Sequence, residues 1–223
     1  MTTKVIGVLG LVVMLAALYF ALIFAPADAL QGAYYRILYF HIPQGILSYA
    51  FVIVLGFVSV MYLAKNDMKW DRFGQCAAEV GLLVGSMSIA SGMIWAKPAW
   101  GVYWAWDARL TFQLLLVLLL VAYLMLRACP PNREKRATLS CAFGLLAVID
   151  LPFNYFSIYW WRTQHPQPVI SPGGGGMDPD MNLALLVSFI AWTLIYTYLW
   201  MQRLQIAKVE DEVEYIDHVV RSI

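Results

Sequence analysis

The sequence predicts an all-α, polytopic integral membrane protein with six transmembrane helices and both termini on the cytoplasmic side. Hydrophobic residues make up 61% of the 223 residues, charged residues make up 13%, and the mean hydropathy is +0.67. Soluble domains hold about 45–50% apolar and about 25% charged residues, so this composition excludes a water-soluble globular fold. A net charge of +1 provides no basic surface for nucleic acid, and we expect no nucleic-acid partner.

Six apolar stretches approach the length of about 20 residues that a helix needs to cross a bilayer. They cover residues 5–25, 45–64, 78–95, 110–126, 137–152 and 183–201. The fifth stretch is short and carries Asp150 near one end. The first has an apolar run about twice as long as the core of a signal peptide, and Pro26 disfavours cleavage after it. We therefore expect a retained anchor.

The distribution of Lys and Arg predicts the orientation of these spans. Eleven of the 15 basic residues fall on the termini and on the connections after the second and fourth spans. Because Lys and Arg accumulate on the cytoplasmic side, the three other connections, 26–44, 96–109 and 153–182, are predicted to be outer-face loops. The domain prediction is a transmembrane domain over 1–201 and a charged cytoplasmic tail over 202–223. The tail either frays in solvent or forms an amphipathic helix that docks on a partner.

A tryptophan-rich motif, Trp-Gly-Val-Tyr-Trp-Ala-Trp-Asp, begins at Trp100 in the second outer segment. If Pro98 opens a helix there, Trp100, Tyr103, Trp104 and Asp107 share one helical face. Scattered Trp residues commonly anchor helices at the membrane surface, but three within seven residues exceed what anchoring requires. The motif therefore favours a flat apolar ledge for a large planar ligand, with indole N–H groups as donors.

Two histidines lie in the outer segments, His41 and His165, and each lies close before a proline. Because the chain before proline is biased away from helix, we expect both in loops, with no histidine inside a span. Taken singly, each histidine is weak evidence for a site and fits an interfacial histidine bonded to backbone or headgroups. Neutral imidazole is the usual axial ligand of haem iron, and the pair beside the ledge indicates a haem site. Four glycines, 173–176, are either loop slack or a hinge that lets His165 move.

A haem also needs cations for its two propionates. Four basic residues are predicted on the outer face, and any of them could pair with a propionate: Arg36, Lys97, Arg109 and Arg162. Asp107 is expected to cap a helix end or to pair with Arg109. The three cysteines form no Cys-x-x-Cys motif, and we expect them to be small buried thiols.

The string Trp100-Gly-x-x-Trp104-x-Trp106-Asp107-x-Arg109 closely resembles the "WWD" motif of haem-handling membrane proteins of cytochrome c maturation. With six spans, the chain resembles the CcmC family rather than its larger relatives CcmF and CcsA. The resemblance covers all three outer segments and implies that haem b binds on the periplasmic face, with His41 and His165 as axial ligands. The cofactor-binding residues that it implies are Arg36, Trp100, Gly101, Tyr103, Trp104, Trp106, Asp107, Arg109 and Trp161.

The resemblance also implies partners and a location. Haem would be delivered to the haem chaperone CcmE, with release driven by the CcmA–CcmB ABC-type complex and with the small membrane protein CcmD as a further partner. The chain would not itself be an enzyme, would contact membrane lipid, and would lie in a bacterial inner membrane or an organellar inner membrane.

Two other functions remain open from the residues. A b-type electron-transfer subunit would place its histidine ligands within helices near the middle of the membrane. A cofactor-free transporter would carry ionisable residues deep in its spans, whereas Glu79 and Asp150 are predicted near span ends. A haem channel would need a wide polar path, which the spans do not suggest.

Overall fold

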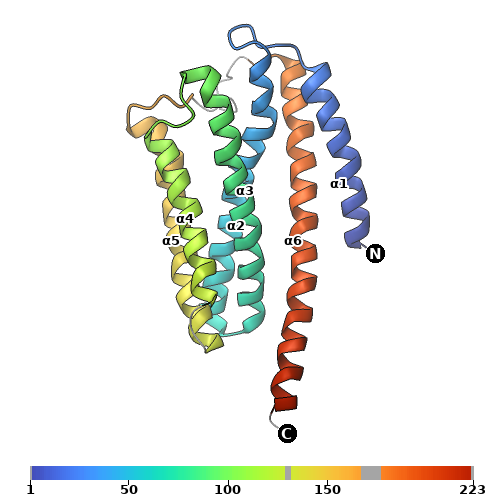
Figure 1. The fold of residues 1–223 in the computed structure, drawn as a ribbon, viewed down its shortest axis with the longest axis vertical. Helices are drawn as coiled ribbons and strands as arrows, with labels where there is room; N and C mark the ends of the chain where they lie inside the picture. Colours follow the sequence, from blue (N-terminus) through green and yellow to red (C-terminus); the bar gives the residue numbers. More distant parts are fainter. Residues whose placement is uncertain (1, 129–131, 167–176, 222–223) are drawn as a thin grey trace.

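The computed structural model describes residues 2–128, 132–166 and 177–221 as a bundle of long helices (Figure 1). The first helix, α1, is Thr2–Tyr19 and continues into a π-helical turn, Phe20–Phe24; a 3-10 turn, Ala33–Ile37, leads into the second helix. The remaining helices are α2 (Leu38–Lys65), α3 (Met68–Trp100), α4 (Ala108–Ala128), α5 (Arg133–Trp160) and α6 (Pro179–Arg221).

Within the described residues, six helical segments are long and apolar enough to cross a membrane, which confirms the predicted fold class. The upper end of the bundle, as drawn in Figure 1, carries the connections α1–α2, α3–α4 and α5–α6. The start of α1 and the end of α6 both point toward the lower end. Both termini therefore lie toward the same end of the bundle, and their assignment to the cytoplasmic side stays a prediction.

Helices α2 to α5 form the central bundle, α6 packs on α2 and α3, and α1 packs mainly on α6. The core consists of small and branched apolar side chains, among them Val52, Leu55 and Leu116, which are all fully buried. Gly56 permits the close crossing of α2 and α5, because a Cβ there would lie 2.3 Å from Val148 Cγ2. Small residues allow this kind of close approach between membrane helices.

The helices extend beyond the predicted apolar stretches, and three of these differences affect the site. Helix α2 begins at Leu38, so His41 lies on a helix and Pro43 lies inside it. Helix α3 continues through Pro98 instead of a new helix opening there, and α5 continues eight residues past its predicted end to Trp160. Membrane helices tolerate proline because neighbouring groups satisfy the freed backbone atoms, and packing in the bundle outweighs the local bias.

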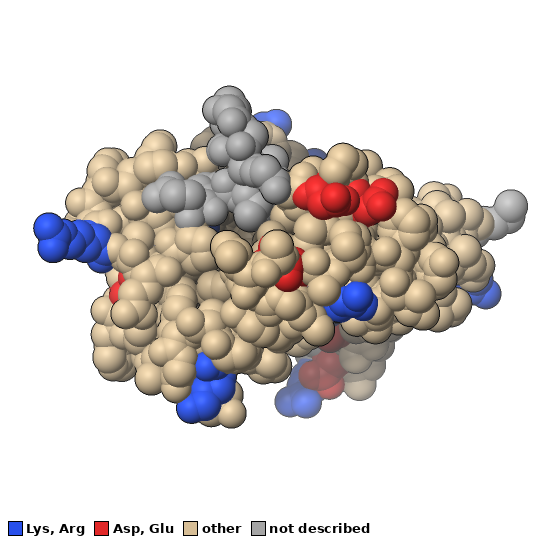
Figure 2. All heavy atoms as spheres, turned by 90° about the horizontal axis from the view of Figure 1, so that it is seen from above, with Lys and Arg blue, Asp and Glu red and all other residues tan. Residues whose placement is uncertain are grey.

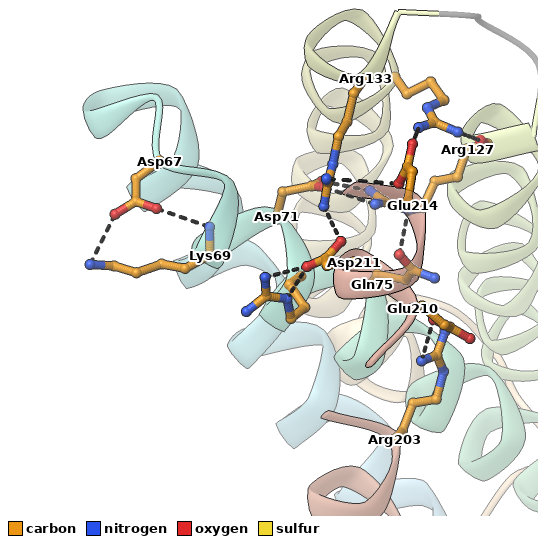
Figure 3. A network of polar contacts seen from close by, with 12 residues as sticks. Asp67, Lys69, Asp71, Gln75, Arg127, Arg133, Arg203, Glu210, Asp211 and Glu214 are labelled. Carbon is orange, nitrogen blue, oxygen red and sulfur yellow. Dashed lines mark hydrogen bonds and ion pairs between the residues drawn. The ribbon is translucent and has the colours of Figure 1, made fainter. Parts of the chain in front are cut away.

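Ion pairs fasten the lower end of the bundle (Figure 3). Arg127 on α4 donates to both oxygens of Asp71 on α3, at 2.5 and 2.8 Å. Asp211 on α6 pairs with Arg72 of α3 and Arg133 of α5. Residues 202–221 continue α6 as a helix, and ion pairs of Arg203, Asp211 and Glu214 hold its first part to α3 and α5.

Candidate functional site

A cavity of about 460 Å³ lies toward the upper end, between α2, α3, α4 and α5. Its volume falls within the range of about 300–1,000 Å³ that is usual for small-molecule and cofactor sites. His41, Trp100, Trp104, Arg109 and His165 all contribute to its wall. The structure therefore brings together residues from all three segments that the sequence analysis singled out.

His41 reaches the cavity from the first turn of α2, with its ring held against α3. Its Nδ1 lies 3.1 Å from the carbonyl oxygen of Ser88 and 3.1 Å from Ser91 Oγ. Since a carbonyl only accepts, the bond to Ser88 places the ring hydrogen on Nδ1 and leaves Nε2 with a free lone pair. A histidine that binds a metal is usually oriented in this way by a second partner.

Gly92 explains how the His41 ring fits so closely to α3. A Cβ at position 92 would lie 2.9 Å from His41 Cε1 and 3.4 Å from its Nδ1. Contacts below 3.0 Å force a shift, so any larger residue at this position would displace the imidazole.

His165 lies in the segment that follows α5, and its Nδ1, like that of His41, contacts a backbone carbonyl oxygen. Its Nδ1 is 2.9 Å from the carbonyl oxygen of Pro166, and its backbone N–H donates to Thr163 Oγ1 at 3.0 Å. Burial lowers the pKa of His165 below its ordinary value of 6.5, although the bond to the Pro166 carbonyl works in the opposite direction. The neutral ring, with Nε2 available as a ligand, is therefore the favoured form.

Asp107 links the histidine segment to the start of α4. Its Oδ1 accepts from the backbone N–H of Arg109 at 2.9 Å, and its Oδ2 accepts from the backbone N–H of Gln164 at 2.8 Å. Of the two roles expected from the sequence, the helix cap is the one found, because the contact to Arg109 runs through its main chain. Asp107 also fixes the residue directly before His165.

Four basic residues are predicted to meet propionates. Of these, Arg109 contributes to the described cavity wall. Its guanidinium donates to the carbonyl oxygens of Asn154, at 2.6 Å, and Tyr155, at 3.2 Å. It also lies 5.8 Å from the centre of the Tyr49 ring. Arg109 thus brings a positive charge to the junction of α2, α4 and α5.

The other three predicted cations lie elsewhere. Arg36 donates to the carbonyl oxygen of Ala25 at 3.0 Å, and Lys97 donates to that of Gly101 at 2.9 Å. Arg162 is exposed.

The tryptophan motif forms a loop instead of the predicted helix. Gly101 has a φ of +79°, a conformation that favours glycine, and its N–H caps the end of α3 by donating to the Lys97 carbonyl. Beyond it the chain is non-helical until Ala108. The shared helical face expected for Trp100, Tyr103, Trp104 and Asp107 is therefore wrong, because the left-handed residue ends the helix directly after Trp100.

The loop divides the motif into an inner and an outer part. Trp100 contacts the buried Trp95 edge-on, with ring centres 5.2 Å apart, and the indole Nε1 of Trp104 is buried without a hydrogen-bond partner. Trp106 is 78% exposed and packs edge-on against Trp104. The following residues implied by the resemblance lie outside the described cavity wall: Arg36, Gly101, Tyr103, Trp106, Asp107 and Trp161.

Several cavity residues were missed in the sequence analysis, above all Tyr49 and Gln113. Both are polar residues within otherwise apolar spans, a pattern that often marks a helix interface or a functional position. That signal could have found them. The wall also includes Trp95, whose Nε1 donates to Gln31 Oε1 at 2.9 Å. The predicted hinge at 173–176 lies outside the described residues.

The position of Asp150 also differs from the prediction. Because α5 continues to Trp160, Asp150 lies well inside this helix and is only 5% exposed. Both of its carboxylate oxygens lack a hydrogen-bond partner. Glu79, by contrast, pairs with Arg203.

The chain is similar to a known family over nearly its whole length. A family model described as Heme exporter protein C matches residues 1–217. The Heme exporter protein C of Bradyrhizobium diazoefficiens is 33% identical over 189 residues, which cover 84% of this chain and 72% of that protein. That of Escherichia coli (strain K12) is 32% identical over 186 residues, covering 82% and 74%.

An organellar protein is similar to the same extent. The putative cytochrome c biosynthesis ccmC-like mitochondrial protein of Marchantia polymorpha is 31% identical over 176 residues, covering 79% of this chain and 75% of that protein. The family model and the relatives agree, and the residues that the family model matches include all the segments that form the cavity. The chain belongs to the Heme exporter protein C family.

Proposed function

We propose that this protein binds haem b in the upper cavity and delivers it to the haem chaperone CcmE on the periplasmic side of a bacterial inner membrane. One observation carries the proposal. His41 and His165 contribute to one cavity, and each has its Nδ1 bonded to a carbonyl oxygen, which leaves both Nε2 atoms free. Two neutral imidazoles with free Nε2 lone pairs match the axial ligands of a bis-histidine haem.

The other cavity residues fit the same ligand. When bound, haem supplies an iron with two axial positions, a flat apolar macrocycle and two carboxylates. Trp100 and Trp104 provide apolar aromatic surface, and Arg109 provides the positive charge. The unpartnered Nε1 of Trp104 is a buried donor that gains a partner only from a ligand or water.

Delivery to a second protein requires that part of the site remain accessible. Next to the cavity, the ends of α5 and of the tryptophan loop expose large aromatic side chains, including Trp106, Trp160 and Trp161. Trp and Tyr are favoured at protein interfaces and at membrane surfaces. We propose that this aromatic surface receives CcmE, with CcmA–CcmB and CcmD completing the assembly.

The charge distribution supports a periplasmic location for the cavity. Seen from above, the upper end is mostly uncharged, and its Lys and Arg side chains stand apart from one another (Figure 2). The lower end carries the dense set of basic residues that includes Arg72, Arg127 and Arg133. Under the positive-inside rule, the lower end is the cytoplasmic one.

An absorption spectrum of the detergent-purified protein tests the proposal, measured beside His41→Ala and His165→Ala. We expect a Soret band with a low-spin, bis-nitrogen pattern in the parent and an altered pattern in both variants. His218→Ala, which removes the third histidine of the chain, is the matched control and should leave the spectrum unchanged. A parent that takes up no haem from a host that overproduces it would overturn the proposal.

The b-type electron-transfer alternative gains one observation, because His41 lies on a helix. His165, however, lies beyond the end of α5, and the cavity is near the helix ends. Mixing the haem-loaded protein with haem-free CcmE separates the two functions. After the two proteins are separated again, a haem-handling protein should have lost its Soret band and CcmE should have gained one. An electron-transfer subunit should keep its own Soret band.

A further inference from the structure

Four polar side chains from α2, α4 and α5 lie close together at the cavity. Asn154 Nδ2 donates to Gln113 Oε1 at 3.0 Å, and the guanidinium of Arg109 lies over the Tyr49 ring. Arg109, Gln113 and Tyr49 contribute to the cavity wall. This group of four residues is called the polar floor below.

The polar floor contains buried hydrogen-bond donors that the protein leaves unused. The Tyr49 hydroxyl and the Gln113 Nε2 are both buried without a hydrogen-bond partner. Leaving such a group unpaired in the interior is unfavourable, so native structures usually provide a partner. The amides of Asn154 and Gln113 share a single hydrogen bond. If both amides were turned over, so that oxygen and nitrogen changed places, one amide nitrogen would still lack a partner. These donors therefore point to an acceptor that enters the cavity.

The charge near these donors favours an anionic acceptor. Arg109 is the cation over Tyr49, with its guanidinium carbon 5.8 Å from the centre of the ring. Asp150 lies one turn before Asn154 on α5 and does not contribute to the cavity wall. A carboxylate that reaches the Tyr49 hydroxyl therefore lies beside the cation of the cavity wall, whereas the nearby acid Asp150 is outside that wall.

The number of residues between these side chains along α2 and α4 shows how far each lies from the upper end of the bundle. On α2, His41 and Tyr49 are eight residues apart, which is about 12 Å along the axis at about 1.5 Å per residue. On α4, Arg109 and Gln113 are four residues apart and share one face. Tyr49 is therefore deeper in the bundle than His41, and Gln113 lies about one turn deeper than Arg109.

We propose that Tyr49 and Gln113, together with Arg109, form a carboxylate subsite that takes a haem propionate, an inference that rests on the proposed haem function. Charge-assisted hydrogen bonds from the hydroxyl and the amide fix the carboxylate next to the guanidinium. The carboxylate edge of the ligand then points into the bundle. The opposite edge, which carries the vinyl groups of haem b, is left toward the upper end and the exposed aromatic surface.

Binding of iron protoporphyrin IX and of its dimethyl ester tests this subsite, because esterification removes both negative charges and leaves the macrocycle intact. Soret titrations of the detergent-solubilised protein give both dissociation constants. We expect the parent to bind the free acid more tightly than the ester. In Tyr49→Phe and Gln113→Met the affinity for the acid should fall about tenfold each, as expected for hydrogen bonds to a charged group, while the affinity for the ester is unchanged.

Tyr39→Phe is the matched control for Tyr49→Phe. It also removes a buried tyrosine hydroxyl that lacks a partner, but from a residue outside the described cavity wall. We expect it to change neither affinity. The low-spin spectrum should persist in all three variants, because both histidines are intact.

The other possible outcomes of the titrations contradict either the carboxylate subsite or the proposed haem binding. Equal losses for acid and ester, or no loss for either, would overturn the subsite and leave haem binding standing. A parent that binds both forms equally well would do the same. A parent that binds neither form would overturn the proposed function itself.

Discussion

Replacing Asp107 tests whether this residue positions His165 as a ligand. The carboxylate caps α4 through the Arg109 N–H and holds the Gln164 N–H at 2.8 Å, one residue before the histidine. Hydrogen bonds to a charged group contribute about 1.5–3 kcal/mol. If the bond to Gln164 is lost, and all of its energy serves to position His165, haem affinity falls about 10- to 150-fold.

Two substitutions separate the cap from the link to Gln164. Asp107→Ala removes both, and the lost cap alone should cost about 0.5–2 kcal/mol of stability. Asp107→Asn keeps an acceptor for the cap but cannot accept from both N–H groups, because one oxygen becomes an amide donor. We expect near-parental thermal stability for Asp107→Asn, together with a clear loss of haem affinity.

The assay is a Soret titration of the parent, both Asp107 variants and His165→Ala, followed by the double variant Asp107→Asn/His165→Ala. If Asp107 acts through His165, the double variant should be no worse than His165→Ala alone. Asp107→Ala with parental affinity and a bis-nitrogen spectrum would refute the reasoning. Exchanging the charges of Asp107 and Arg109 should not restore binding, because their contact runs through a backbone N–H.

Three further predictions concern the ligands and the lower end. In Gly92→Ala the new Cβ would lie 2.9 Å from His41 Cε1, so we expect an altered haem spectrum and an overpacking cost of about 1–3 kcal/mol, measured by thermal unfolding. Asp71→Ala leaves Arg127 without its buried partner and should cost about 3–5 kcal/mol in the same assay. Since burial lowers the pKa of His165, its ring in the haem-free protein should remain neutral as the pH falls through 6.5, as followed by NMR of labelled histidine. Below pH 6.5 the unfolded chain takes up this proton first, so the contribution of His165 to stability falls as the pH is lowered.

Control substitutions of the same residue types distinguish these specific effects from a general loss of stability. Gly45→Ala also changes a cavity glycine, but its Cβ would meet only Ser88 Oγ at 3.7 Å, and the spectrum should be unchanged. Asp217→Ala breaks the exposed pair with Arg221 and should cost no more than about 0.5 kcal/mol. An Asp71→Ala protein as stable as Asp217→Ala would contradict the role given to the buried pair. A His165 ring that titrates at 6.5 or above would contradict the effect of burial.

The sequence was a good guide to the spans and to the segments that meet, and a poorer guide to local geometry at prolines and glycines. Hydropathy predicts six spans because the bilayer requires about 20 apolar residues of each, whatever the neighbours. It does not predict that α2 begins before His41 or that α3 passes Pro98, because packing in the bundle decides these ends. Gly101 is the clearest case, since its positive φ turns a predicted helical face into a loop.

The sequence by itself determined the six-helix membrane class, the two histidines and the tryptophan motif, because these depend on composition, spacing and residue chemistry. Only the tertiary structure decided which of them meet. It selected Arg109 among four cations, added Tyr49 and Gln113, and joined Asp107 to the segment of His165. The physical reason is that a cavity wall is formed by faces of helices distant in sequence, and the rotation and depth of each helix are set by packing against the others.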